Sequence, residues 1–101
     1  MGTTNDVDVA FRRNNLAAGR IGTLSTSFGL ASANINTASA TTAFGLNALA
    51  LNTTAQGNVA VGSSALAANN GTSGSLGGFN TAVGNNTLSS NTSGRFNTAL
   101  G

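Results

Sequence analysis

The sequence predicts an all-β fold, a β-solenoid of stacked coils preceded by an N-terminal β-hairpin, and three observations support it. A short motif recurs at nearly regular spacing along most of the chain. The motif alternates β-branched or large apolar residues with small ones, which is typical of strands. The links between motifs are rich in Asn, Thr, Ser and Gly, which favour turns. A period of this kind is the signature of repeat proteins, in which each unit packs on its neighbours.

The repeat is anchored by glycines that lie 16, 17, 22 and 17 residues apart. We expect each glycine to have a positive φ, or to occupy a place too crowded for a side chain. An Asn recurs seven residues after each of the first four glycines, where we expect turn chemistry. The repeat residues are Gly29, Gly45, Gly62, Gly84 and Gly101, with Asn36, Asn52, Asn69 and Asn91.

Each coil of about 16–17 residues is predicted to contain two short strands. The first ends at the glycine, as in the Thr-Ala-Val segment 81–83, with the large or β-branched residues on one face and the small ones on the other. The second is formed by the Ala-Leu pair that follows. A helical interpretation of runs such as 46–52 is disfavoured, because about seven residues are too few for a stable helix.

The repeats occupy residues 25–101, and the one long link contains an insertion at about 70–79. Five extra residues fall between Asn69 and Asn80, so we expect this link to be a surface loop and the deletion of 71–75 to leave the fold intact. The chain ends on the glycine of an incomplete unit, so we expect the natural protein to continue.

Residues 1–24 differ from the repeats and are predicted to form a connector. Val7, Val9 and Phe11 alternate with other residues, and a turn is expected near Asn14 and Asn15, since Asn accepts positive φ. The resulting β-hairpin would cover the exposed end of the solenoid.

The composition excludes several function classes. Charged residues make up 6% of the chain and the net charge is +2, with no basic cluster interleaved with aromatics, so we expect no nucleic-acid partner. No apolar run is long enough for membrane insertion. The chain has no His, Cys, Lys, Tyr or Glu, so we expect no catalytic residue, no bound metal and no cofactor. Asp6 and Asp8 are interpreted as a solvated strand edge rather than a Ca²⁺ site.

Three residues are candidates for contact with a ligand. Phe79 and Phe96 both precede an Asn-Thr-Ala segment, and their rings would stack either on a sugar or, as we favour, on a neighbouring coil or chain. Arg95 would contact an acidic sugar or serve as a surface charge. The chain has few large apolar residues and no disulfide, which argues against a stable monomer and for several identical chains around one axis.

The motifs NVAVG (58–62), NTAVG (80–84) and NTALG (97–101) resemble the head repeats of trimeric autotransporter adhesins of the YadA type. The resemblance covers residues 25–101 and implies a homotrimeric, left-handed parallel β-roll. That family is displayed on bacterial surfaces and binds host matrix or cells. Similar Asn-Thr-rich repeats occur in tail fibre and tailspike proteins of bacteriophages, including cyanophages.

The function we expect from this resemblance is that of a structural fibre protein attaching a virion to its host. The coils are longer than the usual adhesin unit and Met1 begins no secretion signal, which favours a phage tail fibre. The alternative is the passenger segment of a bacterial surface adhesin, located on the cell surface. The expected partners are two further copies of the chain, other virion proteins through the N-terminal segment, and a glycan or protein of the host surface.

Overall fold

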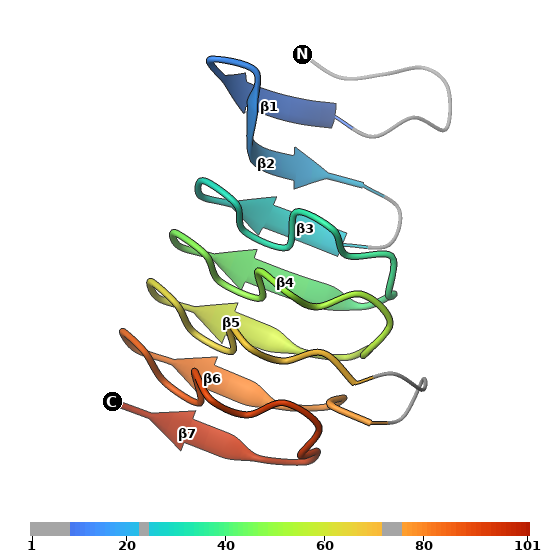
Figure 1. The fold of residues 1–101 in the computed structure, drawn as a ribbon, viewed down its shortest axis with the longest axis vertical. Coiled ribbons are helices and arrows are strands. Elements are labelled where there is room, and N and C mark those ends of the chain that lie inside the picture. The colour runs from blue at the N-terminus through green and yellow to red at the C-terminus, as the bar shows by residue number, and fades with distance from the viewer. Residues whose placement is uncertain (1–8, 23–24, 72–75) are drawn as a thin grey trace.

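The computed structural model describes residues 9–22, 25–71 and 76–101, and these form a β-solenoid without any helix (Figure 1). One seven-stranded sheet follows chain order from one end to the other. The strands are β1 (Val9–Arg13), β2 (Leu16–Ile21), β3 (Ser25–Phe28), β4 (Thr41–Phe44), β5 (Val59–Val61), β6 (Thr81–Val83) and β7 (Thr98–Leu100). The predicted all-β class and the solenoid are therefore confirmed.

Successive coils stack in parallel, with equivalent residues of the repeat directly above one another. From β3 to β7 each strand pairs in parallel with the next, so that Ala43 lies beside Ala60 and Ala60 beside Ala82. Side chains hydrogen-bonded between adjacent coils are 16, 17 or 22 residues apart. The sequence period is therefore the period of the coil.

The first two strands form the predicted hairpin. β1 and β2 are antiparallel, and the turn between them contains Asn14 and Asn15 with φ values of 47° and 64°. β2 also pairs antiparallel with β3, and the Ala18 carbonyl accepts a hydrogen bond from the Gly29 amide at 2.8 Å. The hairpin thus extends the sheet beyond the first coil (Figure 1).

Each anchoring glycine directly follows a strand and has a positive φ, and the first four also lie too close to the next coil to carry a side chain. The φ of Gly45 is +132°, and that of Gly101 is +127°. A Cβ on Gly45 would lie 2.5 Å from the carbonyl oxygen of Gly62 in the next coil. The glycines therefore permit a backbone turn and a close approach between coils at the same position.

The prediction of a second strand in each coil is wrong, because the Ala-Leu segment winds through tight turns. Asn47 and Leu49 have φ values of 59° and 52°, which interrupt an extended backbone. The amide of Ala48 donates to the Gly45 carbonyl at 3.2 Å, a bond spanning three residues. In contrast, the Leu49 amide donates to Ala65 of the next coil at 3.0 Å. Turn bonds and bonds between coils therefore alternate along this segment.

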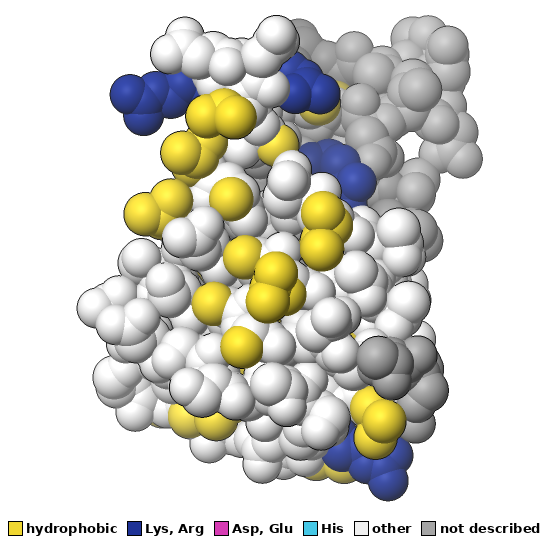
Figure 2. Space-filling model, viewed as in Figure 1, with side chains coloured by type: hydrophobic (Ala, Val, Ile, Leu, Met, Phe, Trp, Pro, Cys, Tyr) yellow, Lys and Arg dark blue, Asp and Glu magenta, His cyan; other side chains and the backbone are white. Residues whose placement is uncertain are grey.

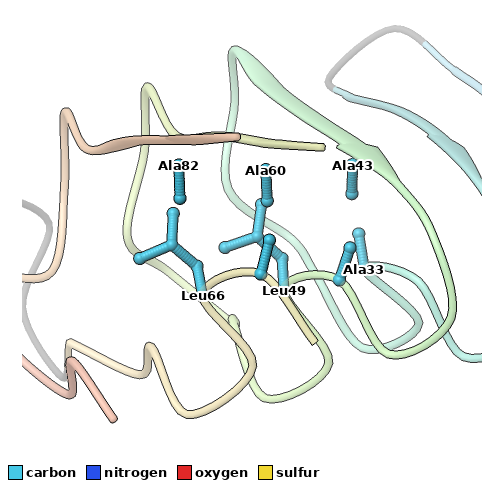
Figure 3. Packing of buried hydrophobic residues seen from close by; sticks show 8 residues of the cluster. Ala33, Ala43, Leu49, Ala60, Leu66 and Ala82 are labelled. Carbon is cyan, nitrogen blue, oxygen red and sulfur yellow. The ribbon is translucent and has the colours of Figure 1, made fainter. Parts of the chain in front are cut away.

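The interior is narrow and filled mainly by alanine. The small residues of the strands point inward, and Ala43, Ala60 and Ala82 face Leu49 and Leu66 on the turn segments (Figure 3). In the described part of the chain the buried hydrophobic residues are eight alanines and two leucines. The predicted division of large and small residues between the two faces is therefore confirmed.

The long link keeps the hydrogen bonds of the shorter ones. Asn52 Nδ2 donates to the Ala55 carbonyl at 3.0 Å, three residues further along. Asn69 Nδ2 makes the equivalent bond to Gly77 at 2.8 Å, eight residues further along. The five extra residues therefore lie between Asn69 and Gly77.

We predict that Gly45→Ala lowers the free energy of unfolding by about 2 kcal/mol or more, because it combines an unfavourable φ with a clash against the next coil. Urea denaturation followed by circular dichroism measures the change. Gly101→Ala is the matched control, since its φ is +127° but a Cβ there meets no atom within 4 Å. Equal losses in both variants would contradict the role given to the contact between coils.

We predict that deleting residues 72–76 leaves the solenoid folded. The deletion joins Gly71 to Gly77, so Gly77 would follow Asn69 by three residues, the same separation as between Asn52 and Ala55 in the link of ordinary length. The expected far-ultraviolet spectrum is unchanged, with a cooperative thermal transition. Deleting residues 53–57 is the matched control: it also removes five residues, but takes them from a link of ordinary length and joins Asn52 to Asn58. If the first deletion abolished folding as the second should, the segment would not be a tolerated insertion.

Candidate functional site

The four predicted repeat asparagines form a ladder of amide side chains inside the solenoid. Asn69 Nδ2 donates to Asn52 Oδ1 at 3.0 Å, and Asn91 Nδ2 donates to Asn69 Oδ1 at 2.9 Å. Asn52 Nδ2 donates in the same way to Asn36 Oδ1. Asn52 and Asn69 are completely buried. Local turn bonds were expected for these residues and are present, and the ladder adds a bond to the neighbouring coil.

This ladder makes each coil depend on the next. A buried amide is costly unless it is hydrogen-bonded. Within the described residues, no side-chain nitrogen or oxygen that is fully sealed from solvent lacks a hydrogen-bond partner. The partner of Asn52 Oδ1 belongs to another coil, so an isolated coil would leave the amide unsatisfied. The asparagines are thus structural residues that select the register of stacking.

A second ladder was not recognised from the sequence as a structural feature. Asn58, Asn80 and Asn97 precede three successive strands, and Asn58 and Asn80 are completely buried. The backbone amide of Asn80 donates to the side-chain oxygen Oδ1 of Asn58 at 2.9 Å, and the backbone amide of Asn97 donates to Asn80 Oδ1 at 3.0 Å. The signal was available, because Asn recurs at this position in three consecutive repeats.

The outward side of the sheet, here called the outer sheet face, presents two rows of apolar and β-branched residues. In the middle of the sheet Phe44, Val61 and Val83 are 39%, 38% and 37% exposed. The Phe28 ring stacks on that of Phe44 with centroids 5.4 Å apart. One row is Val9, Ile21, Thr26, Thr42, Val59, Thr81 and Thr98; the other is Phe11, Phe28, Phe44, Val61, Val83 and Leu100.

Neither row contains a charged residue, and most of the chain is uncharged. The stretch 21–94 contains no Asp, Glu, Lys or Arg. The arginine side chains gather at the two ends of the molecule (Figure 2). Depletion of charge in a continuous row of apolar residues is the composition expected of the centre of a protein interface.

Phe79 and Phe96 are brought together, and Arg95 lies beside them. The two rings are nearly parallel, with centroids 5.2 Å apart and an interplanar angle of 6°. A Cβ on Gly57 would lie 2.7 Å from the Phe79 ring, so Gly57 lies close to that ring, which is 43% exposed. The Arg95 guanidinium is 5.5 Å from the Phe96 centroid. For Phe79 the geometry agrees with packing on neighbouring coils, the interpretation favoured from the sequence.

The described residues offer no group of three or more His, Cys, Asp or Glu side chains that would hold a metal ion. Asp6 and Asp8, considered above as a carboxylate pair, lie outside the described residues. No helix in the described part of the chain is long and apolar enough to cross a membrane.

Comparison with known proteins adds no assignment: no family model, no curated protein and no solved structure matches the chain.

We predict that Asn69→Ala lowers the free energy of unfolding by about 2–3 kcal/mol, since it leaves the buried Asn52 Oδ1 without a partner and removes one of the two bonds that Asn91 Nδ2 donates. Asn70→Ala is the matched control. Asn70 is exposed and its side chain accepts one bond, from Thr53 Oγ1, so its loss should cost about 0.5 kcal/mol or less. Chemical denaturation of both variants checks the difference. Similar values would mean that the ladder does not select the register.

Proposed function

We propose that the chain is a segment of a homotrimeric fibre protein that acts in spacing and attachment, as part of a phage tail fibre. The single observation that carries the proposal is the outer sheet face, which exposes a continuous, uncharged set of apolar side chains. In soluble monomers, contiguous apolar patches of this kind are unusual, and they mark surfaces that bind other molecules.

The composition of the interior supports association. Burying an alanine removes little apolar area from water, and the free energy gained is roughly proportional to that area. Most buried hydrophobic residues of the described chain are alanines, whereas phenylalanine and valine face outward. A solenoid that keeps its larger apolar residues outside gains stability when identical chains cover them.

The proposed trimer places three outer sheet faces around an axis parallel to the stacking direction. In this arrangement, equivalent rows of the three chains would meet along the whole sheet. The described molecule is elongated, with principal extents of 37, 25 and 19 Å. Each added coil would lengthen the fibre without changing the interface, which suits a spacer between two surfaces.

Attachment would depend on residues outside the repeat columns. The repeat glycines and asparagines are engaged in stacking, so contacts with a host glycan or protein would come from the variable links. Three chains would present each link three times, and weak contacts repeated in this way add through avidity. The receptor-facing surface is therefore proposed to be multivalent.

We predict that the chain sediments as a trimer and that Val61→Lys shifts it to monomers. Three lysines would be brought together at the axis, where like charges in a desolvated interface are strongly unfavourable. Gln56→Lys adds the same charge at an exposed link position and should leave the trimer intact. Sedimentation velocity gives the masses. A folded, monomeric wild-type chain over the micromolar range would disprove the proposed assembly.

A further inference from the structure

A cavity of about 180 Å³ lies where the hairpin meets the first coil. Its position follows from the register of the sheet. Arg20 of β2 pairs with Ser27 of β3, and both belong to the row of inward-pointing residues that continues along the sheet through Ala43, Ala60 and Ala82. The coils cover this inward row with their turn segments. β1 and β2 are joined by a two-residue turn instead, so their inward side opens onto the cavity.

The first coil departs from the other coils at this cavity. Ser27 stands where later strands have alanine, and Ser32 stands where the next two coils have Ala48 and Ala65. Ala33 takes the position of the buried leucines Leu49 and Leu66. The three replacements make this part of the interior both wider and more polar. All three residues line the cavity.

The Ser27 hydroxyl is a buried polar group without a protein partner. Ser27 is 2% exposed, and its side chain makes no hydrogen bond to any described residue. In the described part of the chain, every side-chain oxygen that is fully inaccessible to solvent has a hydrogen-bond partner. The Ser27 hydroxyl has none, so it must be accessible, and Ser27 lines the cavity. Ser32 differs, since its Oγ donates to the Gly29 carbonyl at 2.9 Å. A buried hydroxyl normally finds a partner, and here the partner would come from outside.

Two arginine side chains line the same space. Arg20 Nη2 donates to Ser25 Oγ at 2.7 Å and to the Asn36 carbonyl at 3.1 Å, which holds its guanidinium in place. Arg12 Nη1 donates to the Asn15 carbonyl at 2.9 Å. Both side chains line the cavity. Guanidinium groups are the preferred protein partners of carboxylate and phosphate.

We propose that this cavity binds a small oxyanion, a carboxylate or a phosphate, between the Arg12 guanidinium and the Ser27 hydroxyl. Arg20 forms part of the inward wall. The carboxylate would belong to an acidic sugar or to another small organic acid, and the phosphate to a free or sugar-linked group. The site is formed within one chain and does not depend on the trimer or on the attachment role proposed above.

Titration of the whole chain, labelled with ¹⁵N, with sodium phosphate and with glucuronate tests the proposal, and glucose serves as the uncharged probe. We expect saturable amide shifts at Gly19, Ser27 and Asn34 with at least one anion and none with glucose. Binding by phosphate alone would identify a phosphate group, and binding by glucuronate alone a carboxylate. Either result supports an oxyanion site.

Three variants locate the binding. Ser27→Ala installs the residue that the later strands carry, so the fold is retained while affinity falls about three- to tenfold. Arg12→Gln should weaken binding at least as much. Arg95→Gln removes the same charge from the opposite end of the chain and should change nothing.

Three results would overturn the proposal. The first is the absence of saturable shifts with both anions. The second is equal weakening by Arg12→Gln and Arg95→Gln, which would show a general charge effect. The third is binding that appears only after Asp6 and Asp8 are replaced by Asn, which would show that the site is occupied by the chain's own carboxylates.

Discussion

The structure depends on the close contact between the glycine of one coil and the glycine of the next. A Cβ at Gly45 would lie 2.5 Å from the Gly62 carbonyl oxygen, so no other residue fits without moving the coils apart. This contact directly follows the strand, and it sets the spacing between adjacent coils along the stacking direction. The parallel pairing, both asparagine ladders and the outward rows all require the same spacing. A change at one glycine therefore disturbs every column of two adjacent coils.

Polar groups, rather than a large apolar core, provide the specificity of stacking. The interior is too narrow for large side chains. Alanine packing alone would tolerate a shift in the register between one coil and the next. The amides do not tolerate such a shift, because Asn69 must donate both to Asn52 and to the Gly77 carbonyl. A network in which every member is satisfied favours one arrangement, and a partly satisfied one is strongly unfavourable. Folding of the coils is for this reason expected to be cooperative.

Much of this fold could be predicted from the columns of the repeat. The Thr-Ala-Val strands, the inward alanines, the positive φ of the glycines and the turn at Asn14 and Asn15 all follow from residue preferences that act locally. The Ala-Leu segment was assigned wrongly, because left-handed φ values at Leu49 and its equivalents are contrary to the preference of leucine and arise from hydrogen bonds to the next coil. The Asn58 ladder and the cavity beside Ser27 depend on neighbours distant in sequence, so a single repeat does not reveal them.

The distribution of charge connects these features to association. A surface exposed only to water gains solubility from charged side chains, yet residues 21–94 have none. Backbone amides and carbonyls are largely used between coils, and the buried asparagines are fully engaged, so the remaining means of association along the body is apolar contact. The outer sheet face supplies it in rows that repeat with the coil. Because the same rows occur in every coil, the interface proposed above would be repeated in each coil, and its area would grow with the length of the solenoid.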